Sequence, residues 1–135
     1  MSVIKILKSF RNVAVVGVSA NEDKPSYAVF RYLMASGYNV IPVNPTVQEV
    51  LGRKCYPSLS AIPEKVEVVD IFRKSEDVPP IVEEAIKIGA KAVWMQQGII
   101  NDAAADRAQA AGLLVVMDKC MRKEHMHMIE DGQQL

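Results

Sequence analysis

Short apolar runs alternate with helical patterns along the whole chain, and this alternation restricts the fold more than any other feature. Five runs read as buried strands, because each is short, apolar and bounded by turn residues. These runs are residues 13–18, 39–43, 66–72, 92–95 and 114–117. Buried strands joined by helices form parallel sheets, and right-handed connections then cover both faces. The sequence therefore predicts an α/β fold, a Rossmann-like doubly wound parallel five-stranded sheet with helices on both faces.

Helix signals fill the intervals between these runs. The clearest helix is residues 25–36, where Tyr27, Phe30 and Met34 recur at helical spacing. Pro25 suits its first turn and Gly37 its end. Further helices are predicted at residues 1–8, 75–88, 102–111 and 121–129, with a short one near 58–62 inside an irregular crossover of residues 47–63. We expect a single domain over residues 1–129 and a polar tail over residues 130–135.

Composition narrows the class of protein. The 135 residues are half apolar, which suits one hydrophobic core. A net charge of zero argues against nucleic acid as a partner and leaves little electrostatic protection against homo-oligomer formation. No apolar stretch reaches the length of a membrane span, so no membrane partner is expected. Cys55 and Cys120 form no C-x-x-C pair, which is typical of reduced thiols in a cytoplasmic protein.

A strand, a glycine turn and a helix follow one another between residues 13 and 36. This order is typical of a phosphate-binding cradle, because the N–H groups of the turn and of the helix start point at the same place. Gly17, Val18 and Ser19 form the turn, and Lys24 offers a cation to a phosphate. Gly17 is the one glycine of the G-x-G-x-x-G fingerprint that is present. A plain structural turn therefore remains an equal alternative.

The residues at the end of the second predicted strand indicate which nucleotide would bind. NAD-binding proteins place an acid there to hold the ribose hydroxyls, whereas this chain has Asn44 followed by Pro45. Asn44 tolerates a ribose that carries a phosphate, so the 3′-phosphate of coenzyme A (CoA) fits better than NAD. NADP remains open on this argument, and so does a simple Asn-Pro turn.

Two other predicted strands end in residues that could contact a nucleotide. Phe72 and Arg73 place an aromatic ring beside a cation, which could flank an adenine and attract phosphate. Gln97 and Gly98 could offer polar contacts to a ligand that crosses the strand ends. The alternative is a core phenylalanine next to solvated polar residues.

No catalytic or metal-binding constellation stands out. On a helix, His125 and His127 point about 200° apart and cannot face one ion, so we predict no metal site. We expect Asp118 to pair with Arg122 or His125 instead. The chain has neither a G-x-S-x-G elbow nor a Walker A loop, so no catalytic residue is assigned.

Five blocks together resemble the small single-domain CoA-binding proteins, a family similar to the CoA-binding domain of the succinyl-CoA synthetase α subunit. The blocks are VVGVS at 15–19, GYNVIPVNP at 37–45, VDIFR at 69–73, VWMQQGI at 93–99, and DKCM at 118–121 followed by Glu124 and His125. The second and fifth blocks are the specific ones. The resemblance implies a Rossmann-type fold with CoA on the strand ends.

The resemblance also assigns parts of the ligand to residues of this chain. It implies Gly17, Val18 and Ser19 at the pyrophosphate, Asn44 and Pro45 near the adenosine, Phe72 and Arg73 along the adenine, and Gln97 and Gly98 near the pantetheine. The histidine that is phosphorylated in the synthetase belongs to a second domain without a counterpart in these residues. Ligase activity is therefore not implied.

We therefore expect a protein that binds CoA or an acyl-CoA without a catalytic step of its own, with Cys120 as the cysteine to which CoA could be attached through its thiol. The first alternative is an NADP-linked oxidoreductase. The second is a protein-interaction module, in which the strand-end residues are only turns.

Overall fold

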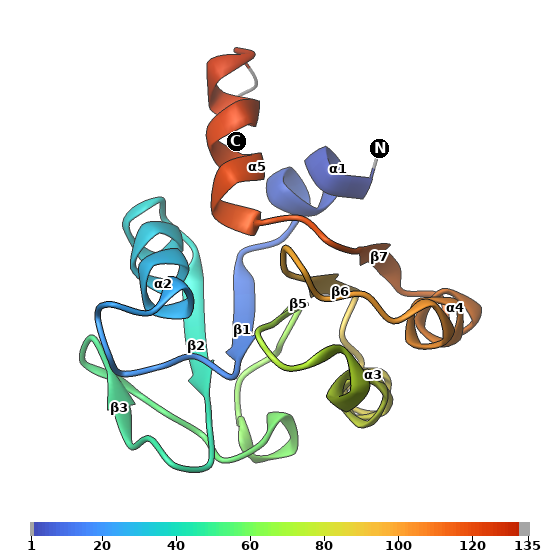
Figure 1. The fold of residues 1–135 in the computed structure, drawn as a ribbon, viewed down its shortest axis with the longest axis horizontal. Helices are drawn as coiled ribbons and strands as arrows, with labels where there is room; N and C mark the ends of the chain where they lie inside the picture. The colour runs from blue at the N-terminus through green and yellow to red at the C-terminus, as the bar shows by residue number, and fades with distance from the viewer. Residues whose placement is uncertain (1, 133–135) are drawn as a thin grey trace.

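A computed structural model describes residues 2–132 and contains the predicted five-stranded parallel sheet. Its strands lie side by side in the order β2, β1, β5, β6, β7 (Figure 1). Their bounds are β1 Asn12–Val16, β2 Asn39–Val43, β5 Val68–Ile71, β6 Ala92–Met95 and β7 Leu114–Val116. The chain leaves β1 toward β2 on one side and returns to β5 on the other. The sheet therefore has its topological switch point between β1 and β5, where doubly wound proteins bind ligands.

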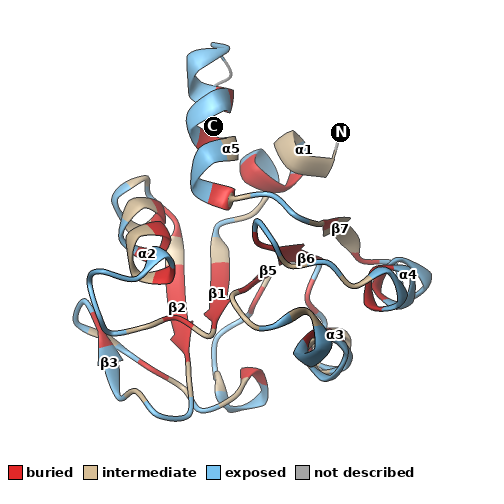
Figure 2. Cartoon of the chain, in the orientation of Figure 1, coloured by how far each residue is buried: buried red, intermediate tan, exposed pale blue. Residues whose placement is uncertain are grey.

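Helices cover both faces of the sheet, as predicted. One face packs against α1 Ser2–Ser9, α2 Pro25–Ala35 and α5 Met121–Glu130, and the other against α3 Val78–Lys87 and α4 Asp102–Ala110 (Figure 1). The strands are buried between these layers (Figure 2). Alternate residues of β5 show the reason, because Val69 and Ile71 enter one core while Val68 enters the other.

The crossover after β2 is less irregular than predicted. It holds a small antiparallel hairpin of β3 Glu49–Val50 and β4 Arg53–Lys54, and a 3₁₀ turn, η1 Leu59–Ala61, lies where the short helix was expected. The two loop residues of the hairpin, Leu51 and Gly52, have φ of 49° and 79°. Two positive φ angles are typical of a type I′ turn, which usually contains asparagine or glycine. Strands of two residues show no periodicity, and Leu51 is not a typical turn residue, so this hairpin was not predicted from the sequence.

The hairpin and the segment after it cover the outer edge of β2. Tyr56 N donates to Pro42 O at 2.9 Å, and Arg53 Nη1 donates to Val40 O at 3.3 Å. Pro42 itself has no N–H to offer. The edge strand is therefore closed to pairing with another chain along these residues.

The C-terminal helix is longer than predicted. α5 includes Glu130, which was expected to start the polar tail, and residues 133–135 lie outside the described part of the chain. No helix between residues 2 and 132 combines the length and the apolar character needed to cross a bilayer.

Candidate functional site at the carboxyl ends of the strands

Gly17 ends β1 in a conformation that only glycine adopts easily. Its φ is +86°, and its N–H donates to Val43 O at 2.8 Å. A Cβ on Gly17 would overlap with the carbonyl oxygen of Phe72, and it would lie 3.3 Å from Cδ of Arg73. The space that the glycine leaves open is therefore filled by the chain itself at the end of β5.

The loop from β1 to α2 is held by local hydrogen bonds. Ser19 N donates to Ser26 Oγ at 2.9 Å, Asn21 N donates to Ser19 Oγ at 3.0 Å, and Asp23 N donates to Asn21 Oδ1 at 2.9 Å. Lys24 is exposed directly before the first residue of α2. The loop is thus a pre-formed turn that leads into a helix start.

Several backbone amides of this loop remain open. Within residues 2–132, the N–H groups of Val18, Ala20 and Glu22 have no hydrogen-bond partner. The Val18 side chain is buried in the core, so only its backbone can meet a ligand. Open N–H groups at the end of a strand can serve an anion.

Asn44 is a turn residue, as the simpler interpretation proposed. Its Oδ1 accepts from both Thr46 N and Thr46 Oγ1 at 2.9 Å, and its Nδ2 donates to Val18 O at 2.9 Å. Pro45 follows it on the surface. The Asn44 side chain therefore ties the end of β2 to the glycine loop.

A cleft of about 500 Å³ opens beside this loop, between the starts of α2 and α5 and the ends of β5 and β6. Its lining is mainly apolar, with cationic residues and one thiol among the polar members. The residues are Pro25, Ala28, Val29, Phe72, Gln96, Gln97, Ile99, Cys120, Arg122 and Lys123. Phe72 and Gln97 were predicted from the sequence, whereas Gly17 and Asn44 lie outside the lining. A cleft with a mainly apolar surface and a few polar groups is the usual form of a small-molecule site.

Gln96 is a polar lining residue that the sequence analysis did not assign to the site. It directly follows β6 and is only 3% exposed, and its Oε1 accepts from Met121 N at 3.1 Å. A glutamine at the end of an otherwise apolar strand was a usable signal, because a polar side chain is buried there only if it has a partner or a ligand.

Asp118 differs from its expected pairing. It adopts φ of +62°, and its Oδ1 accepts from Gly98 N at 2.7 Å. The predicted pairing with Arg122 or His125 is therefore wrong. The carboxylate bridges the loops after β6 and β7, a contact between loops that helical spacing within α5 could not reveal.

The two histidines of α5 differ in burial. His125 is buried on α5, and its Nδ1 lies 2.7 Å from the Tyr32 hydroxyl of α2. Burial, together with the nearby Arg11 guanidinium, lowers the pKa of His125. His127 is exposed. His125 thus acts as a neutral packing residue between two helices.

Asp70 is a buried acid near the cleft. Its side chain is fully buried in the middle of β5, two residues before Phe72, and neither carboxyl oxygen has a partner among residues 2–132. Burial raises its pKa well above the usual value. Residues two apart share a face of a strand, so Asp70 lies on the same face of the sheet as the cleft residue Phe72.

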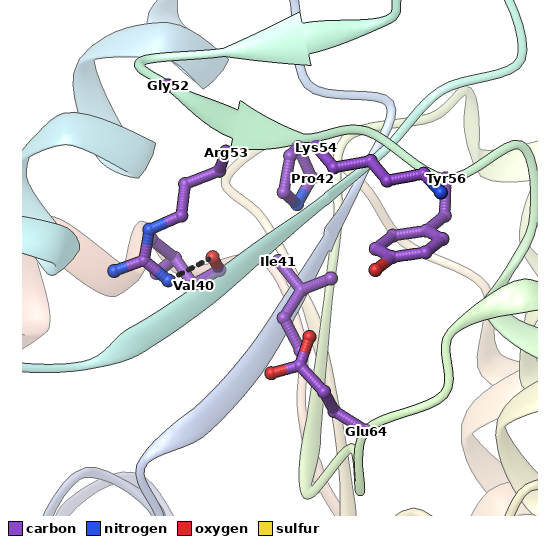
Figure 3. Close-up of a pocket in the computed structure, with 8 residues that line it drawn as sticks. All are labelled: Val40, Ile41, Pro42, Gly52, Arg53, Lys54, Tyr56 and Glu64. Atoms are coloured by element: carbon purple, nitrogen blue, oxygen red, sulfur yellow. Dashed lines mark hydrogen bonds between the residues drawn. The ribbon is translucent and has the colours of Figure 1, made fainter.

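A second hollow lies away from the strand ends. It measures about 230 Å³ and lies between β2, the hairpin and Glu64 (Figure 3). Its cationic groups are engaged, since Arg53 Nη1 donates to Asn39 Oδ1 at 2.7 Å and Lys54 lies over the Tyr56 ring. This hollow is therefore a weaker candidate for a ligand than the cleft.

Comparison with known proteins identifies the family. The family profile described as "CoA binding domain" matches residues 11–126. The uncharacterized protein YneT of Bacillus subtilis (strain 168) is 38% identical over 121 residues, which are 90% of either chain. A solved structure of a hypothetical protein from Pyrococcus horikoshii OT3 is 45% identical with a TM-score of 0.91, covering 94% of this chain and 89% of that one.

Longer enzymes contain a similar segment. The ADP-forming acetate–CoA ligase II of Archaeoglobus fulgidus is 34% identical over 95 residues. That match spans 68% of this chain but only 14% of the ligase. These findings confirm the resemblance drawn from the five sequence blocks. The chain belongs to the CoA-binding domain family.

Proposed function

We propose that this protein binds CoA or an acyl-CoA at the carboxyl ends of its parallel strands, without a catalytic step of its own. The observation that carries the proposal is the position of the cleft. It opens at the switch-point edge of the sheet, beside a loop with open N–H groups, in a chain of the CoA-binding domain family. An elongated ligand with phosphates at one end and a long arm at the other fits both parts.

The parts of the ligand can be assigned by chemistry. The pyrophosphate belongs at the loop of Gly17, Val18 and Ser19, near Lys24, where N–H groups are open and a cation is exposed. Arg73 lies beside Gly17 and adds a second cation. We place the adenosine near the turn at residues 44–45, which holds the loop in place.

The uncharged pantetheine arm belongs in the cleft. Phe72, which the resemblance assigned to the adenine, lies in the cleft lining, and we assign its apolar wall to the pantetheine instead. Gln97 supplies polar groups there, with Gly98 next to it. Both thiols of the chain, Cys55 and Cys120, are free, and we infer a reducing compartment such as the cytoplasm.

Calorimetric titration with CoA, after removal of any co-purified ligand, tests the proposal. We expect saturable one-site binding in the micromolar range, about −8 kcal/mol. Phe72→Ala should weaken binding because it removes the apolar wall. Phe10→Ala, at another partly buried phenylalanine that lies outside the cleft lining, is the matched control.

NADPH in the same titration distinguishes the main alternative. Binding of NADPH in preference to CoA would favour the oxidoreductase. No binding of either up to millimolar concentration would leave the fold in place and favour the interaction module. Because Cys120 lines the cleft, mass spectrometry of protein purified without reductant also tests whether CoA is attached there.

A further inference from the structure

Gln96 places an amide group at the inner end of the cleft. The residue follows β6 directly, lines the cleft and is 3% exposed. Its neighbours in the lining include Val29, Phe72 and Ile99, which offer no hydrogen-bonding side chain. The Gln96 amide is therefore a polar group among mainly apolar walls.

The hydrogen bond to α5 fixes the orientation of this amide. Met121 N can only donate, and it lies 3.1 Å from Oε1 of Gln96. The oxygen is thus held by the first residue of α5, and the nitrogen is the other end of the amide. Among residues 2–132, no group accepts a hydrogen bond from Gln96 Nε2. This donor therefore has no protein partner, and it is not fully buried, so it faces the open space of the cleft.

We propose that Gln96 Nε2 donates a hydrogen bond to a carbonyl oxygen of the ligand's arm, and that Gln96 thereby determines specificity for that arm. This inference rests on the proposed function. A neutral donor beside the apolar side chains of Val29 and Phe72 suits a neutral acceptor. The two cations of the lining, Arg122 and Lys123, are exposed and can serve anionic groups at the surface of the cleft instead. An acceptor on the ligand can replace water at this donor, whereas an apolar group there would leave the donor without a hydrogen bond.

Two kinds of carbonyl in the ligand have this chemistry. CoA carries amide carbonyls along its pantetheine arm, and an acyl-CoA adds a thioester carbonyl at the end of the arm. Titrations with CoA and with acetyl-CoA therefore separate the two sources.

The decisive variant is Gln96→Glu, measured at pH 8 with both ligands. A glutamate keeps an oxygen that accepts from Met121 N but replaces the donor with a second acceptor. The affinity should fall about tenfold, which corresponds to about 1.4 kcal/mol. The loss of affinity should persist at high salt, because salt screens charge repulsion but does not restore the lost hydrogen bond.

Two further variants complete the test. Gln109→Glu makes the same chemical change at an exposed position of α4. This variant should bind both ligands with the affinity of the unmodified protein. Gln96→Met has similar length and no donor or added charge, so it should reproduce the loss seen with Gln96→Glu.

Each outcome decides something. Equal losses for CoA and acetyl-CoA assign Gln96 to a pantetheine amide, and a loss for acetyl-CoA alone assigns it to the thioester. If the folded Gln96 variants bind both ligands within twofold of the unmodified protein, the inference is overturned while the proposed function stands. If the unmodified protein binds neither ligand, both are overturned.

Discussion

The glycine loop and the cleft lie next to each other at the carboxyl ends of the strands, yet their polar side chains differ in whether they have hydrogen-bond partners. In the loop, the side chains of Ser19, Asn21 and Asn44 bond to neighbouring backbone. In the cleft, Gln96 keeps an unpartnered donor between apolar walls. The segment most visible in the sequence thus holds the strand ends together, whereas the cleft lies beside it.

Replacing Gly17 by alanine should give the largest effect. The added Cβ meets the Phe72 carbonyl oxygen, and φ is +86°, so the β1 and β5 ends must move apart. We expect a loss of about 3 kcal/mol in the free energy of unfolding. Urea denaturation of the protein without ligand measures it.

Gly98 provides a matched control for this substitution. It has the same φ of +86°, but a Cβ there would meet nothing within 4 Å. Gly98→Ala should lose only about 1 kcal/mol, from the backbone conformation alone. Equal losses for the two variants would show that contact with Phe72 is unimportant and that Gly17 serves only the turn.

Asp70 should give the next effect, and it concerns the face of the sheet under the cleft. Burial raises the pKa of Asp70, so the folded protein retains a proton that the unfolded chain releases above about pH 4. The resulting destabilisation is absent below the unfolded pKa, grows as pH rises through the interval between the two pKa values, and is then constant.

Asp70→Asn removes this titration while keeping the shape of the side chain. Compared with the variant, the unmodified protein should lose stability as pH is raised from 4 to 8, and the two should be most similar near pH 4. Urea denaturation across this pH range provides the measurement. Parallel pH profiles for the two proteins would contradict a buried, protonated Asp70.

Asn44→Ala should give a smaller loss that is present without any ligand. The substitution removes the bond to Val18 O and both bonds from Thr46, which hold the loop to β2. We expect about 1–2 kcal/mol by thermal or urea unfolding. Asn21→Ala, which removes only the exposed bond that Asp23 N donates to Asn21 Oδ1, should stay within about 0.5 kcal/mol. A normal stability for Asn44→Ala would indicate that the residue serves the ligand rather than the fold.

Much of the fold could be predicted from the sequence, because the hydrophobic periodicity of most elements agrees with the turn residues that bound them. β2 and β6 have the predicted bounds, and α2 starts at the predicted Pro25 and ends one residue early. The hairpin was missed because its strands are too short for a period and its turn begins with Leu51.

The site followed only in part. The strand ends identified where the cleft opens, and Phe72 and Gln97 line that cleft. The other features of the site depend on contacts between residues that are far apart in sequence, and local sequence patterns do not reveal such contacts. Gln96 is held by a residue 25 positions away, and Asp118 by one 20 positions away. The close approach of Phe72 O to Gly17, which explains why a glycine stands there, is likewise a contact between residues far apart in sequence.

The smallest effects concern two exposed lysines on the two sides of the edge. Lys24 precedes α2 at the glycine loop, and Lys123 lines the cleft, where its Nζ donates to Gln97 Oε1 at 3.1 Å. If the phosphates lie at the loop, Lys24→Ala should weaken CoA binding about threefold at low salt and hardly at all at 0.5 M salt. Lys123→Ala should change affinity by less than twofold at either salt concentration. The reverse pattern, with the salt-dependent loss at Lys123, would place the phosphates over the cleft and the arm along the loop, and would reverse the roles that we assign to the two sides.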